Sequence, residues 1–198
     1  MSAVQRIAAV SRRTNETDIH IDVNLDGQGV ADLNSGIGFF DHMLTHIARH
    51  GNIDLKLRCT GDLHIDDHHT VEDVGIALGQ AIAEALGDKA GIVRAGQCTM
   101  PMDEALVSCA LDISGRGFLA EDFNLSTPRL GEYTTELTTE FFRAVAMNAG
   151  ITLHFQQIRG TNTHHVIEAA FKAFARAVAM AVSHSERVKG IPSTKGVL

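Results

Sequence analysis

Two short segments of the chain share the pattern His-His-x-x-Glu, at His68-His69-x-x-Glu72 and at His164-His165-x-x-Glu168. On a helix, the first histidine and the glutamate of each motif share one face, because they are four residues apart, and their Cβ atoms are about 5 to 6 Å apart. Imidazole and carboxylate suit Zn, Mn, Fe, Co or Ni, whereas Ca and Mg prefer shells of oxygen alone. The recurrence of the motif therefore predicts a metal centre.

The two histidines of each motif are adjacent, and adjacent side chains on a helix point about 100° apart. We therefore expect the members of one pair to bind two different ions. A structural alternative is that both motifs are only polar helix N-termini, where Asp67 and Asn162 could act as caps. That alternative does not explain why imidazole recurs in both copies, in a chain with 11 histidines, one tyrosine and no tryptophan.

Two ions need further ligands, and other histidines are spaced to provide them. His42 lies in a helix-like run, where the neighbouring Asp41 could orient its ring. His154 interrupts an apolar strand just before the second motif, and its spacing leaves a core role and a ligand role equally open. His46 and His50 continue the helical stripe from His42, as a metal-binding face or as a solvated one.

A second group of residues could bind an anion. The segment Ser193-Thr194-Lys195-Gly196 combines two hydroxyls, a cation and a flexible glycine, which together can surround a phosphate. Arg94 and Arg116 each lie beside a glycine, where a loop could present the guanidinium, and Lys172 lies one helical turn beyond Glu168. A solvated tail and surface are the alternatives for these residues.

An internal duplication is predicted to position these groups. Glu16–Gly29 and Glu104–Gly117 align without a gap, each with alternating apolar residues and a Gly-x-Gly turn. The sequence predicts two strand-strand-helix-strand-helix repeats, residues 1–92 and 93–198, packed as one unit because each half has a sheet face to cover. The expected elements are helices from Phe39-Phe40 to Gly51, from Phe141-Phe142 to Gly150, over Val71–Leu86 and over Val166–Ser183, and strands over Ile53–Leu57 and Ile151–Phe155.

The composition is that of a globular protein and argues against several classes. The net charge of −7 disfavours a nucleic-acid binder, which needs a concentrated basic face. The apolar stretch Ala173 to Val182 is interrupted by Arg176 and is too short to span a membrane. The N-terminus lacks an apolar signal core, and the three cysteines stand singly, so we expect no disulfide framework and a cytoplasmic location.

Several blocks of the chain resemble one known family. Ile65–Leu78 closely resembles the first signature of imidazoleglycerol-phosphate dehydratases, and Gly160–Ala173 resembles the second. Phe39–Leu44, His50-Gly51, Ser114–Arg116 and Ser193–Gly196 also look like family blocks, and the resemblance extends from about Arg6 to Leu198. It implies an α+β fold, with each half a mixed sheet of about four strands and two helices. The halves would pack as a helix layer between two sheets (ribosomal protein S5 domain 2-like).

The resemblance also implies an activity, the dehydration of D-erythro-imidazole glycerol phosphate to imidazole acetol phosphate in histidine biosynthesis. Such a carbon–oxygen hydro-lyase would use two Mn²⁺ per active site and bind the substrate imidazole as imidazolate. It would form a homo-oligomer, a 24-mer built from trimers, with active sites between subunits.

Carried over residue by residue, the family pattern assigns roles to fifteen positions. The metal ligands would be His42, His68, His69, Glu72, His154, His164, His165 and Glu168. Glu16 would be the acid/base near the glycerol carbons, and the catalytic set would be Glu16, His42, His68, Glu72 and Glu168. The substrate, chiefly its phosphate, would be held by Arg94, Arg116, Lys172, Ser193, Thr194 and Lys195, together with Glu16.

Two other functions compete with this one. A dinuclear metallohydrolase would direct a metal-bound hydroxide at a phosphate ester and release inorganic phosphate. A metal-storing or structural cage would use the histidines only to join subunits, so that replacing Glu72 would break assembly while no small molecule is turned over. Neither accounts for Glu16, the anion-binding tail and the resemblance together.

Overall fold

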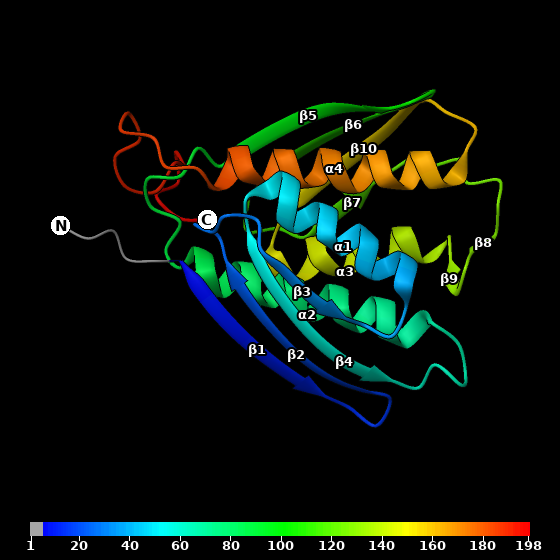
Figure 1. The fold of residues 1–198 in the computed structure, drawn as a ribbon. Helices are drawn as coiled ribbons and strands as arrows, with labels where there is room; N and C mark the ends of the chain where they lie inside the picture. Colours follow the sequence, from blue (N-terminus) through cyan, green and yellow to red (C-terminus); the bar gives the residue numbers. More distant parts are fainter. Residues whose placement is uncertain (1–5) are drawn as a thin grey trace.

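The computed structural model describes residues 6–198 and contains two four-stranded sheets with a layer of α-helices between them (Figure 1). The first half contains β1 (Ile7–Arg13), β2 (Thr17–Asn24), β3 (Ala31–Asn34), α1 (Gly38–Gly51), β4 (Asp54–Gly61) and α2 (His68–Leu86). The second half contains β5 (Ala95–Met102), β6 (Ala105–Asp112), β7 (Phe118–Ala120), β8 (Arg129–Leu130), β9 (Tyr133–Thr134), α3 (Leu137–Ala149), β10 (Thr152–Arg159) and α4 (Thr163–Val182). The duplicated α+β architecture expected from the sequence is confirmed.

The two sheets have the same topology. Their strand orders are β1-β2-β4-β3 and β5-β6-β10-β7, and in each sheet the last strand pairs in parallel while the others pair antiparallel. The sheet of each repeat therefore has one strand more than the strand-strand-helix-strand-helix pattern, and it has the four strands that the family resemblance implies. The additional strands, β3 and β7, are only four and three residues long, too short for a period-two alternation to stand out.

The sheets are amphipathic, as the alternation in β2 predicts. Ile19, Ile21 and Val23 are each 1% exposed, and α2 covers β1 and β2 on this face. In the second half α4 covers β5 and β6, and Phe171 and Phe174 of α4 pack against Phe142 of α3 at ring-centroid distances of 4.7 and 5.3 Å. The long helices thus bury an apolar face, whereas their N-terminal turns carry the histidine motifs.

The helix layer joins the two repeats, because helices of one repeat pack against helices of the other. The long helix of each repeat packs against the first helix of the other, α2 against α3 and α4 against α1. Gly75 and Gly79 of α2 allow this approach, because a Cβ added at either position would lie 2.8 Å from a carbonyl oxygen of α3. Most of the helical core is therefore shared between repeats, and neither half has a complete core of its own.

The two motif helices begin differently. Asn162 caps α4, since its side chain accepts hydrogen bonds from the backbone N–H groups of His164 and His165. The prediction that Asp67 caps α2 is wrong, because its side chain makes no cap hydrogen bond. The buried Asp67 carboxylate instead accepts hydrogen bonds from the backbone N–H of Thr134 at 2.6 Å and from its hydroxyl at 2.7 Å.

Thr134 belongs to the β8–β9 hairpin, which has no counterpart among residues 6–92 of the first repeat. Beside it, the fully buried Tyr133 packs on Phe39 and Phe40, with ring centroids 5.3 and 5.9 Å away. Phe39 in turn lies edge-on to the ring of His164, at 5.1 Å. Asp67 and this hairpin therefore link the start of the first motif helix to the second motif.

None of the helices in residues 6–198 has the length and apolar character needed to cross a membrane.

Replacing Asp67 with alanine is expected to destabilise the fold, because two donors of Thr134 lose their acceptor in a buried place. The free energy of unfolding should fall by about 2 to 3 kcal/mol, measured by urea denaturation of metal-free protein. Asp54→Ala is the matched control, because the Asp54 carboxylate also accepts two backbone N–H bonds, from Gln28 and Val30, at a more exposed place. A loss no larger than that of the control would contradict the buried link.

Candidate functional site

The N-termini of α2 and α4 lie at the same end of the molecule, remote from the C-terminus (Figure 1). α2 begins at His68, the first residue of its motif, and α4 begins at Thr163, one residue before its motif. The motifs are therefore presented on the first turns of two long, well-packed helices. Within each pair the two rings diverge, with centroids 6.1 and 6.0 Å apart and interplanar angles of 84° and 79°.

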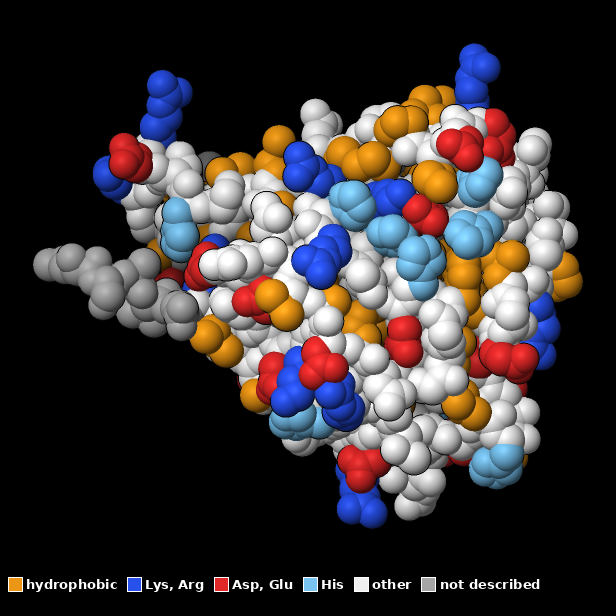
Figure 2. Space-filling model, in the orientation of Figure 1, with side chains coloured by type: hydrophobic (Ala, Val, Ile, Leu, Met, Phe, Trp, Pro, Cys, Tyr) orange, Lys and Arg blue, Asp and Glu red, His pale blue; other side chains and the backbone are white. Residues whose placement is uncertain are grey.

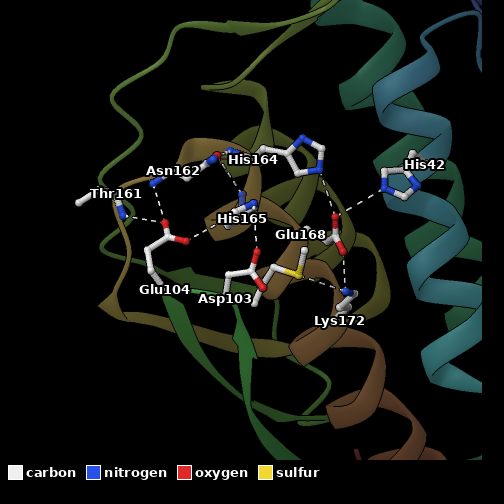
Figure 3. A network of polar contacts seen from close by, with 10 residues as sticks. His42, Asp103, Glu104, Thr161, Asn162, His164, His165, Glu168 and Lys172 are labelled. Carbon is white, nitrogen blue, oxygen red and sulfur yellow. Dashed lines mark hydrogen bonds and ion pairs between the residues drawn. The ribbon is translucent and has the colours of Figure 1, made fainter.

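One set of ligand groups comes together from both repeats: His42 of α1 with His164 and Glu168 of α4, hereafter the α1–α4 cluster (Figure 3). Glu168 Oε2 lies 3.1 Å from His164 Nε2 and 3.5 Å from His42 Nε2. Each residue offers a ligand atom within 4.8 Å of the other two. Among residues 6–198, no other group of three His, Cys, Asp or Glu side chains meets this condition.

The surroundings hold Glu168 in its ionised form. Its side chain is 7% exposed, and Lys172 Nζ donates to Oε1 at 2.5 Å, while His46 Nε2 lies 3.5 Å from the same oxygen. Burial acts to raise the pKa of Glu168, but Lys172 and the nearby histidines outweigh it and lower the pKa to about 2. Figure 2 shows histidine side chains gathered around acidic and basic groups on this face.

His46 is a partly buried member of this neighbourhood. Its Nε2 atom has no hydrogen-bond partner, and burial lowers the pKa of the ring to about 4 despite the opposing effect of Glu168. At neutral pH His46 is therefore an uncharged imidazole beside the α1–α4 cluster, which joins one carboxylate to two imidazoles. Such a donor set fits a divalent transition metal.

The other histidine of the second motif, His165, contacts a different carboxylate. Its Nδ1 lies 2.7 Å from Oε2 of Glu104, the residue just before β6. The bond to His165, followed by the backbone N–H of Asn162, lowers the pKa of Glu104 to about 2, and the same contact raises the pKa of His165.

The first motif forms a second, separate set: His68, His69, Glu72 and Glu16, hereafter the first-motif group. His68 Nε2 lies 3.8 Å from Glu72 Oε2, and His69 Nε2 lies 3.7 Å from Glu16 Oε1. Asp62, just after β4, contacts the other side of the His69 ring at 3.0 Å from Nδ1.

Glu16 lies on the turn between β1 and β2, and the next residue anchors that turn. The Thr17 hydroxyl donates to Asp73 of α2 at 2.5 Å, and the same carboxylate forms an ion pair with Arg12 of β1. Asp73 is 6% exposed. The Glu16 side chain itself is half exposed, so its carboxylate is free to meet a ligand.

His154 joins neither set within the chain. It lies on the outer face of the second sheet, between the inward-facing Leu153 and Phe155 of β10. Its ring is 5.8 Å from that of Phe118, on the neighbouring strand β7. The helices lie on the opposite face of this sheet, so the assignment of His154 as a metal ligand stays a prediction.

Apart from Lys172, the predicted anion-binding residues lie at the other end of α4. Arg94 forms a two-pronged ion pair with Asp112, at 2.6 and 2.9 Å, and donates to the Pro192 carbonyl at 2.8 Å. Gly115, next to Arg116, touches the backbone of Leu198. The C-terminal segment with Ser193, Thr194 and Lys195 is thus bordered by the loops that carry Arg94 and Arg116.

One chain does not bring these predicted anion-binding residues close to its own predicted metal ligands. The backbone of Arg94 is hydrogen-bonded to Ala181 of α4, and Glu168 lies at the opposite end of that helix. A rise of 1.5 Å per residue places these two positions about 20 Å apart. Lys172 lies beside Glu168 instead, away from the tail.

Three carboxylates near the motifs lack a predicted role: Asp62, Asp73 and Glu104. The duplication carries a signal for Glu104, because Glu104 aligns with Glu16. Asp62 and Asp73 carry no such signal, since their partners His69 and Thr17 are set by how the strands and α2 pack.

Comparison with known proteins identifies the family of the chain. The sequence model of the family described as imidazoleglycerol-phosphate dehydratase matches residues 35–178. Imidazoleglycerol-phosphate dehydratases of Dinoroseobacter shibae and Desulforamulus reducens are 58% and 57% identical, each over 98% of this chain and 100% of the relative.

Solved structures give the same answer. The crystal structure of the Staphylococcus aureus dehydratase superposes with a TM-score of 0.82 at 42% identity, covering 90% of this chain and 99% of that one. The Pyrococcus furiosus enzyme, in complex with (S)-C348, also has a TM-score of 0.82, at 36% identity over 96% and 100% of the two chains. The chain belongs to the imidazoleglycerol-phosphate dehydratase family, hydro-lyases that act in histidine biosynthesis.

Proposed function

We propose that this chain dehydrates D-erythro-imidazole glycerol phosphate to imidazole acetol phosphate at a centre of two Mn²⁺ formed between subunits. The observation that carries the proposal is the α1–α4 cluster, in which His42, His164 and Glu168 converge with ligand atoms within 4.8 Å of one another. Two imidazoles and an ionised carboxylate form one incomplete shell for a transition metal. The first-motif group supplies ligands of the same types.

The separation of these groups within one chain supports a shared site. The reaction needs the α1–α4 cluster, the first-motif group and the anion-binding residues of the C-terminal segment at one site. Within one chain these three groups are separate. A second copy of the chain would supply them, as in an oligomer whose interfaces repeat by symmetry. We propose such a homo-oligomer, a 24-mer built from trimers, and we leave His154 out of the ligand set because it lies on the outer sheet face.

Manganese would be held by His42, His68, His69, Glu72, His164, His165 and Glu168. When bound, the two ions would supply Lewis acidity that favours the imidazolate form of the substrate ring. The residues of the chain set the geometry for this step, because both histidine pairs stand on rigid helix starts whose rings diverge toward two positions.

The remaining chemistry concerns the glycerol carbons and the phosphate. The hydroxyl leaves from the carbon attached to the ring, a proton leaves from the next carbon, and the resulting enol becomes the ketone of the product. Glu16, half exposed beside His69, is the group we assign to proton transfer. Arg94, Arg116, Lys172, Ser193, Thr194 and Lys195 would hold the substrate, chiefly its phosphate, and fix its orientation.

Replacing Glu16 with glutamine tests the proton-transfer role. Manganese content should be unchanged, because Glu16 is not among the proposed ligands, while turnover should fall by about 100-fold or more. Metal analysis and a steady-state assay with imidazole glycerol phosphate measure both quantities. Full activity of the variant would remove Glu16 from the mechanism.

Metal dependence tests the centre itself. Protein stripped with a chelator should lose activity and regain it with Mn²⁺, because no proposed ligand can replace the Lewis acid. Zn²⁺ and Mg²⁺ are added in parallel. Steady release of inorganic phosphate would favour the metallohydrolase instead, and no turnover with any ion would favour the cage.

Mixing two inactive variants tests whether sites are shared. His68→Ala damages the first-motif group and His164→Ala damages the α1–α4 cluster, so both homo-oligomers should be inactive. When the metal-free chains are mixed and reassembled with Mn²⁺, about one quarter of shared sites would combine intact groups from two chains.

The matched control mixes His42→Ala with His164→Ala, which damage the same cluster and should not complement each other. Recovery in the control, or none in the test mixture, would contradict the shared site.

A further inference from the structure

Glu16 and Glu104 occupy equivalent positions in the two repeats, yet each meets a different nitrogen of its histidine. Glu16 Oε1 lies 3.7 Å from Nε2 of His69, beyond hydrogen-bond distance. Glu104 Oε2 lies 2.7 Å from Nδ1 of His165. One position of the duplicated unit therefore has two distinct roles.

Glu104 is anchored on its other side by the loop that leads into α4 (Figure 3). Its Oε1 accepts hydrogen bonds from the backbone N–H of Asn162 at 2.9 Å and of Thr161 at 3.3 Å. Asn162 is also the residue that caps α4. Glu104 thus connects the start of β6, the loop before α4 and the imidazole of His165.

We propose that Glu104 is a positioning residue that fixes the tautomer of His165 with the proton on Nδ1, leaving the Nε2 lone pair free for a metal ion. The role rests on the proposed function, which makes His165 a ligand. It assigns to Glu104 no contact with substrate or metal.

The tautomer follows from the chemistry of the two groups. A carboxylate ion only accepts hydrogen bonds, and the neutral form of the imidazole, which is the form that binds a metal ion, has a single N–H to donate. At 2.7 Å from Glu104, that N–H must be at Nδ1, so Nε2 keeps its lone pair. Asp103 is the carboxylate on that side, and its Oδ2 lies 3.8 Å from Nε2, too far for a hydrogen bond that would hold the proton there.

In the first repeat, the carboxylate that orients the corresponding histidine, His69, comes from a different position in the repeat. Asp62 Oδ2 lies 3.0 Å from Nδ1 of His69, so the carboxylate that orients His69 comes from the segment after β4. Because Asp62 has this role, Glu16 is not needed for it and faces the Nε2 side of the ring. The duplicated position could then serve ring orientation in one repeat and proton transfer in the other.

Glu104→Gln provides the sharpest test, because glutamine keeps the size of the side chain and changes only its donors and acceptors. The backbone N–H groups of Thr161 and Asn162 still need the carbonyl oxygen. The amide NH₂ then faces His165, and the proton of the ring must move to Nε2. Manganese affinity is expected to fall by about 10- to 100-fold.

Two measurements read out the change. Two-bond ¹⁵N–¹H correlation spectra of metal-free protein, recorded at a pH high enough to deprotonate the His165 ring and with His165 assigned by its absence in His165→Gln, report the tautomer directly. Titration with Mn²⁺ followed by electron paramagnetic resonance reports the affinity. Glu104→Asp keeps a carboxylate, so it should retain the wild-type tautomer and lose less affinity, which also covers the case in which the glutamine variant folds poorly.

Glu16→Gln is the matched control at the equivalent position, and it should change neither the His165 tautomer nor the manganese affinity. An unchanged tautomer in Glu104→Gln would overturn the positioning role. Because the spectra use metal-free protein, they test Glu104 independently of the centre, whereas a wild-type chain that binds no manganese would overturn the proposed function.

Discussion

The packing of each long helix against the first helix of the other repeat is the interaction on which the rest of the structure depends. Because α4 packs on α1 and α2 packs on α3, the first helix of one repeat lies beside the motif helix of the other. His42 lies close to His164 and Glu168 only because α1 packs against α4. The two sheets supply an apolar face for each long helix, while the ligand geometry is set at helix starts, which packing holds rigid.

Much of this could be predicted from the sequence, since the relevant signals are local. The alternation of Ile19, Ile21 and Val23 predicts a strand, the Ala-rich amphipathic runs predict both long helices, and the repeated motif marks where they begin. The β8–β9 hairpin was not predicted, because strands of two residues are too short to show an alternation of apolar and polar residues. The role of Asp67 was not predicted either. An aspartate just before a helix is typical of an N-cap, but the Asp67 carboxylate is buried against Thr134.

The candidate site was predictable in its residue types and less so in its grouping. Spacing along a helix places Glu72 near His68 and Glu168 near His164, and both contacts are present. Spacing does not show that His154 faces away from the helices, because one residue more or less along a strand changes the face. Nor does it show the partners of Glu104 and Asp62, which are set by how loops meet after the chain has folded.

The origin of the α1–α4 cluster has a consequence for folding. His42 comes from the first repeat, and His164 and Glu168 come from the second, so a partly folded chain with a single ordered repeat holds no such cluster. A cation bound there stabilises only states in which both repeats are docked, by mass action on the native state. The cluster would therefore raise the cooperativity of unfolding, by penalising intermediates in which one repeat opens while the other stays intact.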